Sequence, residues 1–140
     1  MKLRVLIPLA ILALIVGGIY GYLQYNRTAE NPMDMKADIS VAAHELMDEF
    51  EKDENAANAK YNGKVIAVKG NIREVNKKED GTVEVILATN SDLAGVACVC
   101  SGENAKTAES YAVGEAVVAK GTCTGLLSDI IISPGAVSKE

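Results

Sequence analysis

Three cysteines are the side chains of this sequence best suited to chemistry, because a thiol can form a bridge, bind a metal or act as a redox nucleophile. Cys98 and Cys100 stand two apart in an apolar run and so share one face of a strand, whereas Cys123 belongs to a later run. We expect one disulfide, Cys98–Cys123 or Cys100–Cys123, or three buried reduced thiols acting as small apolar side chains. No Cys-x-x-Cys pair is present, which disfavours thiol redox catalysis.

Other catalytic or metal-binding arrangements are weakly supported. His44 is the only histidine, and it stands between Ala43 and Glu45 in an acidic segment, as a solvated side chain would. A metal site built on the three sulfurs would need a fourth ligand. The sequence has no nucleophile elbow and no glycine-rich phosphate loop. We therefore predict a protein that is not an enzyme, with no catalytic, metal-binding or cofactor-binding residues and no cofactor.

A polar row on one predicted strand is the candidate ligand-binding face. Lys69, Asn71 and Arg73 alternate with apolar residues and so point outward together, and Lys64, Lys77 and Lys78 extend the row. Basic residues in such a row can follow the phosphates of a single-stranded nucleic acid. The competing interpretation is a solvated strand face whose lysines oppose aggregation.

The N-terminal segment predicts a membrane helix. Val5–Leu23 is 19 residues long and uncharged, which suffices to cross a bilayer. Lys2 and Arg4 precede it, so the positive-inside rule places the N-terminus in the cytoplasm and the remaining chain on the extracytoplasmic, periplasmic side. A cleaved signal peptide is the alternative, although no Ala-x-Ala site follows the run. We assign 1–25 to the anchor, 26–37 to a linker and 38–140 to one folded domain.

The chain beyond the anchor is acidic. From Thr28 onward, 11 basic residues face 19 acidic ones, a net charge of −8. Such a domain repels polyanions at long range, which disfavours nonspecific binding to nucleic acid. Acidity also keeps a small domain soluble.

Helical spacing opens the folded domain. Asp38 or Ser40 is a suitable N-cap, and the predicted helix runs to about Asn55. Six apolar residues share its inner face: Ile39, Ala42, Ala43, Leu46, Met47 and Phe50.

Two similar segments, Gly63–Gly70 and Gly114–Gly121, mark the strands of a small barrel, because each is a short apolar run closed by Lys-Gly. A broken alternation near Arg73 predicts a β-bulge. Strands are expected at about 64–76, 82–89, 95–100, 115–123 and 126–133, with turns at Asp80-Gly81 and Thr124-Gly125 and a short helix at 103–111. This order predicts a mainly β fold, a five-stranded OB-fold barrel with an N-terminal amphipathic helix and a second helix between strands three and four.

Five segments of the chain follow the pattern of a known family: Leu46–Phe50, Ala59–Lys64, Val68–Ile72, Val96–Cys98 and Lys120–Gly125. In these segments the chain resembles the tRNA_anti-like OB-fold family of uncharacterised bacterial envelope proteins. The resemblance covers about residues 38 to 137. Family members often have a further cysteine in the last strand, where this chain has Ser133-Pro134-Gly135, so a disulfide at that position cannot form here.

Together these features predict a non-catalytic, single-pass membrane protein whose OB-fold domain binds or scaffolds a protein, peptide or saccharide at the cell envelope. The alternative is a single-stranded RNA- or DNA-binding OB-fold protein with a cytoplasmic domain, which the charge disfavours. The ligand, the oligomeric state and the pathway are not set by the sequence.

Overall fold

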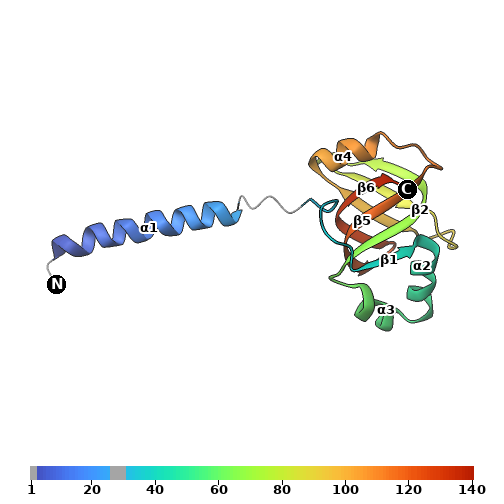
Figure 1. Ribbon diagram of the computed structural model, residues 1–140, viewed down its shortest axis with the longest axis horizontal. Coiled ribbons are helices and arrows are strands. Elements are labelled where there is room, and N and C mark those ends of the chain that lie inside the picture. Colours follow the sequence, from blue (N-terminus) through green and yellow to red (C-terminus); the bar gives the residue numbers. More distant parts are fainter. Residues whose placement is uncertain (1–2, 26–30) are drawn as a thin grey trace. The chain divides into compact units, whose positions relative to one another are not determined.

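The computed structural model describes residues 3–25 and 31–140, and the chain divides into two compact units, Met1–Glu30 and Asn31–Glu140. Within the first unit, α1 (Leu3–Tyr25) is a single helix with Pro8 in its second turn (Figure 1). Its segment Ile7–Gln24 is long and apolar enough to cross a membrane, by length and composition. The predicted apolar helix is therefore confirmed as a helix.

The second unit begins inside the segment that the sequence assigned to a linker. Residues 26–30 of that predicted linker lie outside the described residues. Pro32 is buried, and Lys120 donates a hydrogen bond from Nζ to the carbonyl oxygen of Met33 over 3.0 Å. The chain from Asn31 onward is thus packed against the folded domain.

A closed five-stranded barrel is the body of the second unit, as predicted (Figure 1). The strands run side by side in the order β2-β3-β4-β6-β5, and β5 pairs with β2 to close the barrel. β4 and β6 are parallel, and the other barrel pairs are antiparallel. The bounds are β2 (Val65–Lys77), β3 (Val83–Leu87), β4 (Val96–Cys100), β5 (Ala116–Leu126) and β6 (Ile130–Lys139).

The two similar segments of the sequence pair with each other. The first half of β2 lies antiparallel to β5, with Ile66 opposite Gly121 and Gly70 opposite Val117. After Ile72, β2 changes partner and pairs with β3, and the register shift between Ile72 and Glu74 is the predicted bulge. One long, bent strand can therefore hydrogen-bond to both of its barrel neighbours.

Glycines permit the closest backbone approach in the barrel. Gly121 of β5 lies opposite Gly135 of β6. A Cβ atom on Gly121 would collide with the carbonyl oxygen of Pro134, and one on Gly135 would collide with Sγ of Cys98. Both glycines are therefore needed for space, because any larger residue would push β5 and β6 apart.

The first helix starts later than the spacing predicted, which corrects the proposed N-cap. Residues Ile39–Ala42 form a short strand, β1, that pairs in parallel with β2. Asp38 supports this pairing and caps no helix, since its backbone N–H donates to Val65 O (2.7 Å) and its Oδ2 accepts from Val65 N–H (3.1 Å). Because 39–42 also contains β-branched residues, the same apolar pattern suits a strand once β2 offers a free edge.

Two helices replace the single predicted one. α2 (Ala43–Lys52) ends at Asp53, and α3 (Glu54–Tyr61) follows it directly. Asp53 has an extended backbone, and its Oδ1 accepts a hydrogen bond from Ala56 N–H at 3.1 Å, which makes it the N-cap of α3. α2 buries Ala43, Leu46, Met47 and Phe50, and α3 buries Ala57 and Tyr61.

The short helix between strands three and four is confirmed as α4 (Gly102–Glu109), which buries Ala105 and Ala108. One contiguous core joins these helices to the inward rows of the strands. The inward residues of β3 and β4 are all fully buried: Val83, Val85, Leu87, Val96, Cys98 and Cys100.

The last hairpin differs from the sequence prediction. Thr124-Gly125 is no turn, because β5 continues to Leu126, and the turn lies between β5 and β6, where Leu127 N–H donates to Asp129 O at 3.0 Å. Gly125 has φ +102° and occupies one of two register shifts that bend β5 along β6. β6 runs on to Lys139, beyond the predicted end at Ser133.

Replacing Gly121 by alanine tests the close approach of β5 and β6. We expect Gly121→Ala to lower the free energy of unfolding by about 2 kcal/mol or more, since the new methyl meets backbone atoms that cannot rotate away. Gly70→Ala is the matched control, because its nearest neighbour is the Ala43 Cβ at 3.0 Å, at the start of a helix that can shift slightly. Urea denaturation followed by circular dichroism measures both, and an equal or smaller loss for Gly121→Ala would contradict the steric account.

Candidate ligand-binding surface

Two of the three residues of the predicted binding face lie on the outer side of β2 near β5. Lys69 and Asn71 are both exposed. Lys69 Nζ lies 3.8 Å from Oε1 of Glu140, and Asn71 Nδ2 donates to the carbonyl oxygen of Gly114 at 3.4 Å. Both side chains therefore have partners within the chain, at the C-terminus and in the loop that leads into β5.

Arg73 points elsewhere because the bulge turns it. Its Nη1 donates to the carbonyl oxygen of Ala94 at 3.5 Å, and its Nη2 lies 4.0 Å from Oδ1 of Asp129. The same Asp129 oxygen accepts a hydrogen bond from Gly95 N–H at 2.7 Å. Arg73 therefore joins the loop before β4 to the loop before β6, and the structure does not bring the three predicted residues into one free row.

The neighbouring lysines of the row also pair with carboxylates. Lys77 Nζ lies 2.7 Å from Glu109 of α4, and Lys78 Nζ lies 3.2 Å from Glu84 of β3. Glu84 is only 18% exposed, so this pair is partly shielded from solvent. The sequence could not reveal these partners, since each acid is distant from its lysine along the chain or belongs to another strand.

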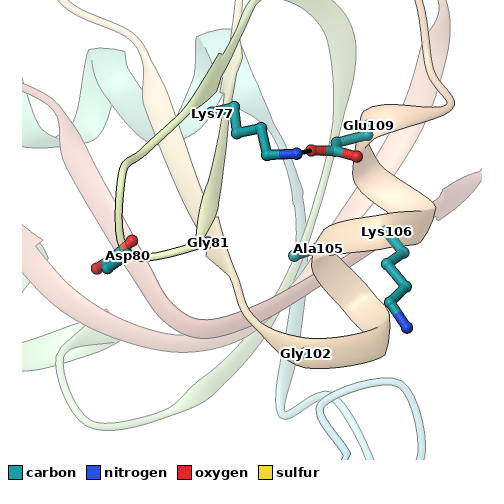
Figure 2. A pocket seen from close by; sticks show the side chains of 7 residues that line it. All are labelled: Lys77, Asp80, Gly81, Gly102, Ala105, Lys106 and Glu109. Carbon is teal, nitrogen blue, oxygen red and sulfur yellow. Dashed lines mark ion pairs between the residues drawn. The ribbon is translucent and has the colours of Figure 1, made fainter.

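A hollow of about 380 Å³ lies between the β2–β3 hairpin and α4 (Figure 2). Figure 2 shows Lys77 reaching from the strand to Glu109, with Asp80 and Lys106 at opposite sides. Small residues, Gly81 and Ala105 among them, leave the space open, and charged side chains border it. The residues that line it are Lys77, Asp80, Gly81, Gly102, Ala105, Lys106 and Glu109.

The pKa of Asp80 at this rim is lowered, because the side chain and backbone N–H of Thr82 both hydrogen-bond to its carboxylate, at 2.7 and 2.9 Å. The hollow thus keeps a negative charge beside its lysines at neutral pH. Sequence reasoning treated Asp80-Gly81 as turn chemistry only and missed this site, since no motif links the hairpin to α4.

The outer face of β3 and β4 is mostly apolar. Ile86 is 7% exposed and Ala97 is fully buried, and the two lie opposite each other in the ladder. In the described part of the barrel unit, Phe50 and Tyr61 are buried and stacked on each other at 6.1 Å, and Tyr111 is partly buried against the core. This face therefore offers no aromatic platform on which bases could stack.

The three cysteines are free thiols, and all are fully buried. Sγ of Cys98 lies 3.8 Å from Sγ of Cys100. Ile132 of β6 stands opposite both Cys98 and Cys123, so β6 lies between the strands that carry these two thiols. The structure forms neither of the two bridges that the sequence suggested, Cys98–Cys123 or Cys100–Cys123.

Neither Cys98 nor Cys123 is poised for redox chemistry. The hydrogen bond with Cys100, together with burial, raises the pKa of Cys98, and burial raises the pKa of Cys123. His44 lies exposed on α2. Within residues 3–25 and 31–140, no group of three His, Cys, Asp or Glu side chains is placed to hold a metal ion.

A second charged cluster fastens the two helices together. Oε1 and Oε2 of Glu49 accept hydrogen bonds from Lys60 Nζ at 2.9 and 2.8 Å, and Oε1 also accepts one from the Tyr61 hydroxyl at 3.0 Å. The hydrogen bond from Lys60 lowers the pKa of Glu49. A further hollow of about 370 Å³ opens beside this cluster. These contacts hold α3 against α2, so we interpret the cluster as structural.

The model of the tRNA_anti-like family matches residues 1–133 of this chain. The chain belongs to the tRNA_anti-like family. The match starts at residue 1 and so includes α1 as well as most of the barrel. No match was found among the curated proteins.

One solved structure shares the fold of this tRNA_anti-like protein, and two others are less similar. A lipoprotein from Klebsiella pneumoniae subsp. pneumoniae, described as a proposed nucleic-acid binder, is 16% identical with a TM-score of 0.60 and covers 75% of this chain and 100% of its own. A chain of the S. pombe Stn1–Ten1 complex is 18% identical with a TM-score of 0.42. The match covers 54% of this chain and 59% of the other. The Entamoeba histolytica asparaginyl-tRNA synthetase with asparaginyl-adenylate is 12% identical with a TM-score of 0.45. The match covers 75% of this chain and 24% of the synthetase chain.

Thiol labelling tests the state of the cysteines of the tRNA_anti-like barrel. We expect Cys98, Cys100 and Cys123 to resist iodoacetamide at pH 8 in the folded protein, because all three are buried, and to react together after unfolding without reductant. Intact-mass spectrometry counts the labels. Only one label on the unfolded, unreduced protein would establish a disulfide and contradict the free-thiol arrangement.

Proposed function

We propose that this chain is a non-catalytic binding module that a membrane helix tethers at the cell envelope, where its OB barrel recognises a protein, peptide or saccharide. The observation that supports this most directly is the pairing of its outward cations. Lys69, Arg73, Lys77 and Lys78 each lie within 4.0 Å of a carboxylate oxygen. Four of the five cations in the row that would have to follow a phosphate backbone are thus already paired with acids.

Charge favours this proposal over nucleic-acid binding. To bind phosphates, each of these lysines would have to leave its own carboxylate, which would then face the polyanion unpaired. Counterion release gives such binding most of its affinity, and a paired lysine contributes little to it. The chain after the anchor has a net charge of −8, which also disfavours nucleic-acid binding. The burial of its aromatic residues disfavours it too, because bases have no ring to stack on.

Tethering rests on α1 and on the charges around it. Its 18-residue apolar segment is followed by Asn31–Glu140, a unit with its own core, as in a small domain presented by a single anchor. Lys2 and Arg4 precede the helix, which favours an extracytoplasmic barrel. The Klebsiella lipoprotein of the same fold is described as a proposed nucleic-acid binder, and that description supplies the competing outcome for the binding experiment.

An oligonucleotide titration tests the choice of ligand. We expect the full-length protein in nanodiscs to show no saturable change in fluorescence anisotropy with labelled 20-mers of dT or rU, up to the roughly 100 µM typical of nonspecific contacts. The double variant Glu84→Gln and Glu109→Gln is the control, since freeing Lys78 and Lys77 should create weak, salt-dependent binding. Salt-dependent binding by the unmodified protein that Lys69→Ala and Arg73→Ala reduce would contradict the proposal and favour nucleic acid.

Protease accessibility tests the tether and its orientation. In intact spheroplasts, added protease should digest the barrel domain at exposed loops while a cytoplasmic marker protein survives, because Lys2 and Arg4 hold the N-terminus inside. Sodium carbonate extraction of the membranes is the companion measurement, and the full-length chain should stay in the pellet. Protection of the barrel until lysis would reverse the orientation, and release of a shortened chain into the periplasm would establish a cleaved signal.

A further inference from the structure

Two solvent-exposed leucines lie on adjoining loops of the barrel. Leu93 is 92% exposed in the loop between β3 and β4, and Leu127 is 83% exposed in the turn between β5 and β6. In the described part of the barrel unit, Val113 is the only other large apolar side chain with comparable exposure, at 67%. Leaving two leucines in water forgoes the free energy that their burial would supply, so their place on neighbouring loops calls for a physical reason.

The two loops are bound to each other two residues after each leucine. Gly95 N–H donates to Asp129 Oδ1 at 2.7 Å, and Ile130 N–H donates to Gly95 O at 3.0 Å. Arg73 reaches both loops from the bulge of β2, through Ala94 O and the Asp129 carboxylate. The leucines are therefore displayed by one connected structure and not by two independent loops.

Each loop is also fixed internally. Thr89 Oγ1 donates to Ala94 O at 2.6 Å, and Ala94 N–H donates to Ser91 Oγ at 3.3 Å, which closes the first loop around Leu93. Leu127 N–H donates to Asp129 O at 3.0 Å in the second. Loops fixed in this way keep the leucines from folding back onto the barrel and reduce the conformational entropy lost when a partner binds.

Two acidic groups lie at the loop that carries Leu93 and indicate the chemistry of the partner. Asp92 directly precedes Leu93 and is exposed. Asp48 of α2 lies beside the same loop, with both carboxylate oxygens 3.4 Å from Asn90 Nδ2. An anionic bilayer would repel these carboxylates, and a symmetric contact between two copies would place like charges together. A protein surface with an apolar recess and basic residues around it fits both features.

We infer that Leu93 and Leu127, held together by Arg73 and Asp129, form a docking surface for a protein partner that has an apolar recess bordered by lysine or arginine. This surface is separate from the hollow between the β2–β3 hairpin and α4. The inference rests on the proposed function in that it assigns the partner class to protein. It adds a role for Arg73 as the residue that positions the two loops.

Site-specific photo-crosslinking in living cells tests the docking surface with the full-length chain. The photoreactive residue p-benzoylphenylalanine replaces Leu93, Leu127 or, as the matched exposed control, Val113. We expect positions 93 and 127 to give an adduct with one and the same protein, and position 113 to give none. Mass spectrometry identifies the adduct and its contact peptide, which should contain apolar residues next to lysine or arginine.

Second-site changes make the result specific. With the photoreactive residue at 127, Leu93→Ser should reduce the adduct about tenfold, the effect of losing one buried leucine, and Val113→Ser should leave it unchanged. Asp92→Lys should reduce it at least severalfold. Circular dichroism melts should be unaltered by all three changes, because each side chain is exposed.

Several outcomes overturn the inference. These are no adduct from either leucine position, an adduct with phospholipid, an adduct of twice the chain's mass, an equal adduct from position 113, or a yield that Asp92→Lys leaves unchanged. The photoreactive residue at two other exposed positions, Lys69 on β2 and Lys106 beside the hollow, separates this failure from a failure of the proposed function. A protein adduct only from these positions would reject the docking surface and retain a protein-binding module, whereas a nucleic-acid adduct there would reject both.

Discussion

The contact of β5 with β6 at Gly121 and Gly135 is the constraint on which the barrel depends. A side chain at either position would meet backbone or the Cys98 sulfur, so the strands approach this closely only with two glycines in register. Their approach lets β6 lie between β5 and β4, and β5 is then free to pair with the first half of β2. Closure removes every free edge of the barrel except where β1 adds to β2.

Closure also determines the charge pattern of the surface. Once the strands are ordered β2-β3-β4-β6-β5, acids from β3, α4, the β5–β6 turn and the C-terminus come within reach of the cations on β2 and in the turn after it. A row that is basic in the sequence becomes a set of ion pairs. Each exposed pair stabilises the fold by little, but together they cancel the field that a polyanion would need.

The bulge after Ile72 links the barrel to its loops. It lets β2 change partner from β5 to β3, and in doing so it turns Arg73 away from Lys69 and Asn71 and toward Asp129. The same local irregularity that bends the strand thus connects the loops that display Leu93 and Leu127. The bend that β2 needs to close the barrel and the connection between the two leucine loops therefore both come from this bulge.

The sequence by itself determined the apolar helix, the five strands, the bulge and the helix between strands three and four, because these depend on local periodicity and on glycine positions. It misassigned Ile39–Ala42 and Thr124-Gly125, since the first pairs with a strand distant in sequence and the second is held extended by β6. Only the tertiary structure decided which partners Lys69, Asn71 and Arg73 contact. It also decided that β6 lies between Cys98 and Cys123, and that the two leucine loops are hydrogen-bonded to each other. Each of these depends on which strands become neighbours, and strand neighbours are set by the closure of the whole barrel and not by any local pattern.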